Sequence, residues 1–251
     1  MPKKPEVGAS GGRAQARKIT AAQAAAEKRR RLLWQLGAFA TVAVVVIVVT
    51  VAVLAGQGGS AKTVEGAPAG VSKQGGIFVG AEDAPVTLTM VEDFQCPVCR
   101  DFEAANKTLL DRYAAGDEVR LEYRPIAFLD RASTTEYSSR ALNAAACFQA
   151  AEPAKWRDFH GLLFDNQPPE QSAGLSDDDL VALAVKAGAG ESEMSTCVQD
   201  RRYETWVKST TDVNTNAPGF DGTPMVSVNG KVLDNPTTEA IEAAVAAALK
   251  G

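Results

Sequence analysis

The chain has 251 residues, of which 45% are hydrophobic and 23% charged, so most of it can fold around a core. Its formal net charge is −5, and no basic region large enough for nucleic-acid binding occurs after residue 31. The chain has four cysteines but only one histidine, His160, which restricts the metal sites and acid–base catalysts that it can form.

An uncharged apolar run, LLWQLGAFATVAVVVIVVTVAVLA, occupies residues 32–55 and meets the length of ~20 residues that a transmembrane helix needs. The basic sequence KRRR precedes it, and only Lys62 and Lys73 follow before Glu82, so the positive-inside rule places the N-terminus in the cytoplasm. A cleaved signal peptide is the alternative, but both the apolar run and the leader before it are long for one. We therefore expect a cytoplasmic tail (1–31) and a single-pass anchor in the cell membrane, with the rest of the chain extracytoplasmic.

The segment 56–76 is rich in Gly, Ser, Ala and Lys, which predicts a flexible linker. VTLTMV (86–91) is apolar and β-branched and predicts a strand, and the helical pattern after it continues to Gly116. Residues 119–129 predict a second strand. A strand–helix–strand order implies a parallel pair joined by a crossover helix.

A helical pattern then extends from about residue 133 to residue 213. It contains SDDDLVALAVKAG, with Ser176 as N-cap and acids in the first turn that suit the helix dipole. Residues 191–215 are expected to form one helix. Asn229-Gly230 predicts a β-hairpin turn, and the last helix is expected to start at Asn235 with Pro236 in its first turn. The whole order predicts an α/β fold with a mixed sheet.

The sequence FQCPVC places Cys96 and Cys99 between the first strand and the first helix. A zinc site is disfavoured because no second CxxC is present, and a structural clip would close too short a loop to stabilise much. The redox interpretation has positive support. With Cys96 as N-cap and Pro97 at the first helical position, the helix N-terminus stabilises a thiolate, and Cys99 lies one turn further on to resolve mixed disulfides.

These motifs, together with WRDFHGLLFDNQ and GTPMVSVNG, make residues 72–250 resemble the DsbA-like thiol–disulfide oxidoreductases of the thioredoxin superfamily. The resemblance implies a thioredoxin fold formed by residues 77–132 and 214–251, with a helical domain (133–213) inserted into it. It also implies that Thr223-Pro224 is the family's cis-proline pair, whose backbone pairs with the substrate peptide near the disulfide.

Two positions depart from the family pattern. Val98 stands where strong oxidants carry a histidine that stabilises the thiolate. Met90 stands where the family has a buried acid six residues before the first cysteine, and Glu92 is a candidate proton relay in its place, since it lies on the same strand face. The alternative for Glu92 and Asp93 is a solvated strand end.

The remaining cysteines, Cys147 and Cys197, both fall on predicted helices. An extracytoplasmic location and an even cysteine count favour a structural disulfide between them, worth about 4 kcal/mol in the loop-entropy model, and some family members have such a second pair. Two unpaired buried thiols are the alternative. His160 is expected to be structural, on a helix that packs against the core.

The resemblance implies an enzyme that introduces disulfides into unfolded exported proteins through Cys96–Cys99. It needs no cofactor, because the disulfide is the redox centre, and a membrane oxidase of the DsbB or VKOR type would reoxidise it. One alternative is a reductase or isomerase that uses the same site. Another is a peptide-binding module without catalysis.

Overall fold

A computed structural model of the chain describes residues 63–251. The predicted cytoplasmic tail, the predicted transmembrane helix and the first part of the predicted linker lie outside the described residues. Within residues 63–251, none of the helices combines the length and the apolar character that a membrane span requires.

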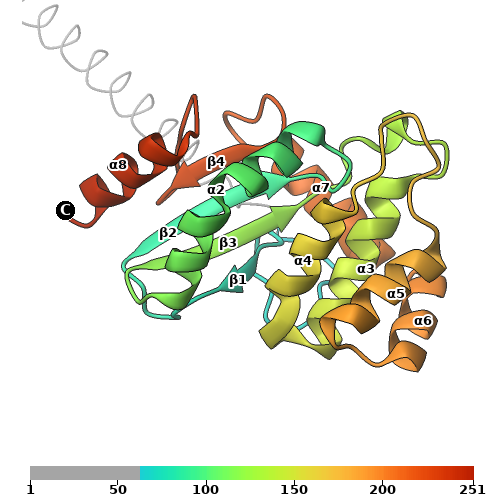
Figure 1. Ribbon diagram of the computed structural model, residues 1–251. Coiled ribbons are helices and arrows are strands. Elements are labelled where there is room, and N and C mark those ends of the chain that lie inside the picture. The colour runs from blue at the N-terminus through green and yellow to red at the C-terminus, as the bar shows by residue number, and fades with distance from the viewer. Residues whose placement is uncertain (1–62) are drawn as a thin grey trace, which may run out of the picture. The chain divides into compact units, whose positions relative to one another are not determined.

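The described residues contain a five-stranded sheet with the strand order β1-β3-β2-β4-β5 (Figure 1). Its strands are β1 (Ile77–Val79), β2 (Val86–Glu92), β3 (Val119–Pro125), β4 (Met225–Val228) and β5 (Lys231–Val232). The predicted parallel pair is confirmed, since β2 and β3 run parallel, and the other neighbouring strands are antiparallel. β2 is buried almost throughout, which suits the apolar run of a central strand.

Helix α2 (Pro97–Ala115) is the crossover between the parallel strands. It crosses one face of the sheet, and α8 (Thr238–Ala248) lies next to it (Figure 1). The predicted hairpin is confirmed, with Asn229 and Gly230 both at positive φ between β4 and β5. The predicted start of the last helix was wrong. The Thr237 side chain accepts a hydrogen bond from the backbone N–H of Ala240, which makes Thr237 the N-cap.

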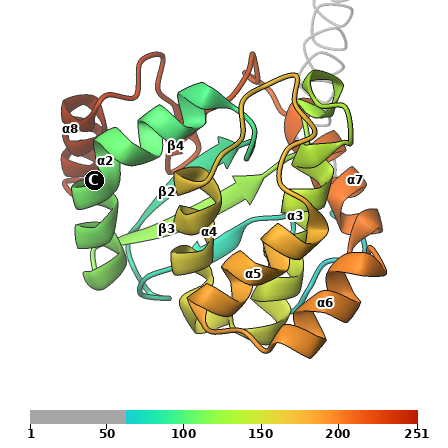
Figure 2. The same ribbon diagram turned by 45° about the vertical axis from the view of Figure 1, so that its right-hand side comes forward.

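Between β3 and β4 the chain forms a block of helices, of which α3 to α6 lie next to one another beside the sheet (Figure 2). The α-helices of the block are α3 (Tyr137–Ala151), α4 (Trp156–Asp165), α5 (Asp177–Ala187), α6 (Glu191–Gln199) and α7 (Glu204–Thr215), with short 3-10 turns at Asp130–Ala132 and Pro153–Lys155. The single helix predicted for residues 191–215 was wrong, because the backbone of Arg201 turns to φ 49° and separates α6 from α7. Ser176 caps α5 as predicted.

From residue 64 onward, the segment that was predicted as a flexible linker packs against the folded part of the chain. Val64 is 9% exposed, the backbone N–H of Glu65 donates to Ser209 of α7, and the side chain of Asn214 donates to the carbonyl of Gln74. Val71 forms an isolated bridge with Ile77, the first residue of β1. Side chains of α7 thus satisfy backbone groups of this segment, and the packed part of the chain begins about a dozen residues earlier than expected.

Candidate active site

The two cysteines of FQCPVC lie where β2 ends and α2 begins. Cys96 is the N-cap, with extended backbone angles of φ −75° and ψ 116°, and Pro97 occupies the first turn, as predicted. Neither Cys96 nor Cys99 is in a disulfide, and their exposed fractions are 6% and 0%. The sulfur of Cys96 is therefore the one that an incoming thiol can reach.

The two thiols differ strongly in acidity. The pKa of Cys96 is lowered to about 6, chiefly by a hydrogen bond from the Cys99 thiol, with further contributions from the Thr223 side chain and the backbone N–H groups of Cys99 and Val98. Burial raises the pKa of Cys99 well above its ordinary value. A reactive thiolate at Cys96 and a protonated thiol at Cys99 give the division of labour that thiol–disulfide exchange requires.

The loop before β4 faces Cys96. The Thr223-Pro224 peptide bond is cis, the isomer that the resemblance implied, and Cys96 Sγ lies 3.4 Å from the carbonyl oxygen of Thr223. A groove of about 570 Å³ passes this loop and the first turns of α2, where Val98 is 60% exposed. An exposed apolar side chain beside a reactive thiol suits contact with a peptide.

Asp93 holds the loop that carries the cysteines. Its side chain is buried and accepts hydrogen bonds from the backbone N–H of Gln95 (2.8 Å), the backbone N–H of Leu129 (2.8 Å) and the hydroxyl of Ser138 (2.6 Å). Burial raises its pKa to about 6. The solvated strand end that we considered for Glu92 and Asp93 was therefore wrong, because both side chains are buried.

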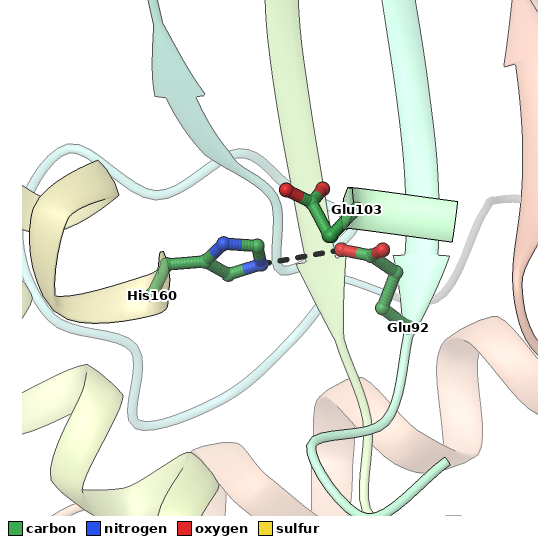
Figure 3. Close-up of side chains that lie close together, drawn as sticks. All are labelled: Glu92, Glu103 and His160. Carbon is green, nitrogen blue, oxygen red and sulfur yellow. Dashed lines mark hydrogen bonds and ion pairs between the residues drawn. The ribbon is translucent and has the colours of Figure 1, made fainter. Parts of the chain in front are cut away.

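Glu92 lies in a buried polar cluster with residues from α2 and α4 (Figure 3). Its Oε2 is 3.2 Å from Nε2 of His160, and the side chains of Glu92 and His160 are 3% and 1% exposed. One carboxylate oxygen of Glu92, one carboxylate oxygen of Glu103 and one ring nitrogen of His160 lie within 4.8 Å of one another. Arg157 completes the cluster, 3.9 Å from Glu103, and its guanidinium donates to the hydroxyl of Tyr123.

Burial sets the charges in this cluster. It raises the pKa of Glu92 to about 8, assisted by the negative charge of Cys96, and raises that of Glu103 to about 7. It lowers the pKa of His160 to about 4, so the imidazole is neutral near pH 7. The negative charge of Glu92 in turn adds to the raised pKa of Cys99, so the carboxyl of Glu92 is electrostatically coupled to both cysteines.

The expectation that His160 packs against the core is confirmed, but it missed the contact with Glu92. The imidazole lies among four aromatic rings, at centroid distances of 4.5 to 5.6 Å: Phe94, Tyr123, Trp156 and Phe164. These rings fix its position, and the hydrogen bond to Glu92 uses one of its nitrogens. No sequence signal linked Glu103 or Arg157 to Glu92, because the three lie on different elements.

The composition of this cluster also raises the question of a divalent cation. Two carboxylates and an imidazole are suitable ligands. Here Arg157 already brings positive charge to Glu103, and the hydrogen bond between Glu92 and His160 already pairs two of the three groups. Among the described residues, Glu92 Oε1, Glu103 Oε1 and His160 Nδ1 are nevertheless buried without a hydrogen-bond partner.

The other residues singled out from the sequence lie apart from the reactive sulfur. Cys147 of α3 and Cys197 of α6 form a disulfide inside the helical block, with a Cα–Cα distance of 5.9 Å. Phe94 is buried at 1% exposure and packs on Phe164, while Phe220 packs on Phe128.

Comparison of this chain with known proteins finds relatives in both sequence and fold. The family model described as Thioredoxin matches residues 72–247, well over half of the chain. In the reduced DsbA of Mycobacterium tuberculosis, a solved structure, 93% of the chain aligns with 70% of this one, with 27% sequence identity and a TM-score of 0.61. Disulfide bond formation protein D of Bacillus subtilis is 26% identical over 170 residues, which cover 65% of this chain and 72% of that protein.

A similar segment also occurs inside a larger protein. The serine/threonine-protein kinase PknE of Mycobacterium tuberculosis is 30% identical over 158 residues, which are 60% of this chain. Those residues make up 28% of the kinase, so the chain spans less than a third of the length of that relative. The match carries no information about the remainder of the kinase.

Proposed function

Because this chain belongs to the thioredoxin family, whose model matches residues 72–247, we propose that it is a DsbA-like protein dithiol–disulfide oxidoreductase that introduces disulfides into exported proteins. One observation carries the proposal. An acidic thiol, Cys96, lies at the start of a helix beside a buried, weakly acidic thiol, Cys99, and faces a cis-proline loop. The site needs no cofactor, since the disulfide itself accepts two electrons.

In the oxidising direction, a substrate thiolate attacks Cys96 Sγ of the Cys96–Cys99 disulfide. The bond between the two sulfurs breaks, Cys99 leaves and takes up a proton, and a mixed disulfide joins Cys96 to the substrate. A second substrate thiolate then attacks the substrate sulfur of that bond and releases Cys96 as a thiolate. The substrate leaves with a new disulfide, and the enzyme has gained two electrons and is a dithiol.

The acidity of Cys96 supports this direction over the reverse. Lowering the pKa of a thiol to about 6 stabilises the dithiol form near neutral pH, and a stabilised dithiol makes the corresponding disulfide a stronger oxidant. Val98 contributes neither charge nor a side-chain hydrogen bond to this effect; the Cys99 thiol and the Thr223 side chain supply it instead. A reductase or isomerase that uses the same site is the alternative.

The groove beside Thr223-Pro224 suits an extended peptide. The backbone of this loop lies close to the reactive sulfur, where β-type pairing would recognise unfolded chains with little dependence on their side chains. Thr223 and Pro224 are thus the proposed substrate-binding residues. The proposed substrates are unfolded exported proteins that contain cysteines.

The proposed location follows from the sequence before residue 63. The apolar run 32–55 would anchor the chain in the cell membrane, with the N-terminus cytoplasmic and the catalytic part outside, where disulfides persist. A DsbB- or VKOR-type membrane oxidase would then return Cys96 and Cys99 to the disulfide.

Trapping tests the function most directly. The full chain carrying Cys99→Ala is expected to accumulate mixed disulfides between Cys96 and its partners, which mass spectrometry of non-reduced adducts identifies. Cys96→Ser is the matched control and is expected to form none. Adducts with exported cysteine-containing proteins would support the oxidase. If both variants trap nothing, or if Cys96→Ser retains the activity of the native chain, the proposal is wrong.

The reduction potential decides between the oxidase and its alternative. An oxidase is expected to lie well above the value of about −270 mV typical of thioredoxin, toward the value of about −120 mV of a strong oxidant. Equilibration with glutathione buffers measures it. A potential near that of thioredoxin would favour the reductase.

A further inference from the structure

The proposed peptide groove continues along α2 to the first turn of α8. Val98 and the Thr223-Pro224 loop line the part next to the reactive sulfur, and Glu239 of α8 lines the groove as well. The distance along α2 from Pro97 to the groove residue Asn106 is roughly 13 Å at 1.5 Å per residue, the span of about four extended residues. A bound substrate therefore meets side chains beyond the cis-proline loop.

We propose that this groove selects substrate segments that carry lysine or arginine within about four residues of the reacting cysteine. The acidic side chains of Asp101, Asp221 and Glu239 would supply the selectivity. The inference rests on the proposed function and deepens it, because it names a substrate class for the same site. Backbone pairing at the cis-proline loop accepts any extended chain, so a preference has to come from the side chains of the groove.

The charge of the groove has a single sign. Within the part of the chain that the structure describes, the charged side chains that line it are Asp101, Asp221 and Glu239, all of them acidic. They come from α2, from the loop before β4 and from α8, so no single helix accounts for the negative charge. The groove between α2 and α4 differs, since Lys107 and Arg157 line it together with several carboxylates.

Most of this negative charge is available to a ligand. Asp221 and Glu239 are exposed, and within residues 63–251 the side chain of neither one forms a hydrogen bond or an ion pair. Asp101 lies 3.2 Å from its neighbour Arg100, but the two side chains are 72% and 47% exposed. Water screens an exposed pair of this kind, so Arg100 offsets only one of the three carboxylates, and only in part.

The walls of the groove are held in place before a substrate binds. The hydroxyl of Thr238 in α8 donates to Oδ1 of Asn106 in α2 over 2.8 Å, and Nδ2 of Asn106 donates to the carbonyl of Phe102 over 3.0 Å. Asn106 is only 2% exposed, so these bonds are protected from water. The acidic first turn of α8 is thus fixed against α2, and a substrate does not have to order it.

The mixed surface of the groove suits lysine and arginine in particular. Both residues combine an apolar stem with a cationic head. The stem can lie on the exposed Val98 while the head meets the carboxylates of Asp221 or Glu239. A glutamate or aspartate in the same place would bring like charges together, which disfavours an acidic segment.

A basic neighbour also helps the chemistry of the substrate. A lysine or arginine beside a cysteine favours its thiolate, the form that attacks Cys96. The groups that lower the pKa of Cys96 itself are Cys99, Thr223 and Val98, and the three groove carboxylates are not among them. Neutralising those carboxylates is therefore expected to change the choice of substrate while the pKa of Cys96 stays the same.

The test compares three peptides of equal length, each with two cysteines flanked by lysine, by glutamate or by serine. The oxidised full chain is mixed with each reduced peptide, quenched with acid at successive times, and analysed by mass spectrometry. The peptide becomes a disulfide as the Cys96–Cys99 disulfide becomes a dithiol, so no other oxidant takes part. Each rate is divided by the rate of the same peptide with hydroxyethyl disulfide, which removes differences in the reactivity of the peptide thiols.

With the native chain at low salt, we expect the normalised rate of the lysine peptide to exceed that of the glutamate peptide by about tenfold or more. About 1 M salt should reduce this ratio to about threefold or less, because it screens the charges. The double variant Asp221→Asn, Glu239→Gln should show the reduced ratio already at low salt. Its rate with the serine peptide and its pKa at Cys96 should equal those of the native chain.

Glu191→Gln is the matched control. Glu191 is exposed in the first turn of α6, as Glu239 is in the first turn of α8, but it does not line the groove. It is expected to leave the ratio of the two rates unchanged. The double variant Asp221→Lys, Glu239→Lys adds the opposite test and should reverse the preference in favour of the glutamate peptide.

Equal normalised rates of the native chain with the lysine and glutamate peptides would overturn the inference and leave the proposed function standing. A ratio that Glu191→Gln lowers as much as the neutral double variant would also overturn it. If the oxidised chain converts none of the three peptides, the proposed function is refuted together with the selectivity.

Discussion

Glu92 Oε2 and His160 Nε2 lie 3.2 Å apart in the interior, although 68 residues separate them in the sequence. The contact joins the strand that leads into the CxxC to helix α4 of the helical block. It therefore connects the acidity of the active site to the packing of a segment with no cysteine of its own.

The acidity of Cys96 should depend on its neighbour. A hydrogen bond from the Cys99 thiol is the largest cause of the lowered pKa, so Cys99→Ala should move the pKa of Cys96 upward from about 6. Thiolate absorbance at 240 nm, or the pH dependence of alkylation, measures it in the full chain. An unchanged pKa in Cys99→Ala would mean that the helix N-terminus and Thr223 alone stabilise the thiolate.

The buried carboxyl of Glu92 should make the oxidised protein less stable at high pH. Burial is the largest cause that raises its folded pKa above the unfolded value of 4.5, to about 8 in the dithiol form, and burial acts in the oxidised form as well, so the folded state binds the extra proton in this window. The associated stability is fully present below pH 4.5 and is lost as the pH rises through about 8. Asp93 and Glu103 act in the same direction.

Urea unfolding of the oxidised chain at pH 5.5 and pH 8.5 measures this effect. Glu92→Gln cannot ionise, so it should reduce the loss between the two pH values by at least about 1 kcal/mol. A pH dependence identical to that of the native chain would contradict the assigned role of Glu92 as a proton-binding group.

Asp93 should matter chiefly for the position of the active-site loop. Asp93→Ala leaves the Ser138 hydroxyl and two backbone N–H groups unsatisfied in the interior, which should lower the free energy of unfolding by about 2–4 kcal/mol. Asp101→Asn is a suitable control, since the Asp101 side chain is 72% exposed and should change stability by less than about 0.5 kcal/mol. Equal effects of the two variants in urea unfolding would refute this account.

The packing of residues 64–76 can be tested at Gly75. Its φ is +87°, and a Cβ there would lie 2.1 Å from the hydroxyl oxygen of Thr210, so Gly75→Ala should destabilise the protein by about 1–3 kcal/mol. Gly161→Ala is the matched control in α4, where a Cβ meets nothing within 4 Å, and should be neutral or stabilising by about 0.5–1 kcal/mol. If Gly75→Ala proved neutral, the segment would be a free linker after all.

The sequence predicted the parts of the fold that local pattern encodes. The β-branched run of β2, the Asn229-Gly230 turn and the Ser176 cap each carry their signal within a few residues, and each is confirmed. β1 was missed because three residues give no readable period, and the break at Arg201 was missed because no Gly or Pro marks it. Such features depend on contacts that sequence periodicity does not contain.

The distinction between local sequence patterns and contacts formed on folding also applies to the candidate active site. Cys96 at a strand-to-helix junction was recognisable because its chemistry follows from adjacent residues. The cluster around Glu92 was not, since its partners Glu103, Arg157 and His160 come from α2 and α4 and are neighbours only after folding. Burial then shifts their acidity, and a charged strand end gives no sign of that burial in sequence.

The protein itself contains a structural disulfide, between Cys147 and Cys197, and formation of such bonds is the reaction that we propose it catalyses. A newly made copy with reduced cysteines consumes one oxidising equivalent to join α3 to α6, in addition to the one that it delivers to a client. Mature copies can supply that equivalent to immature ones.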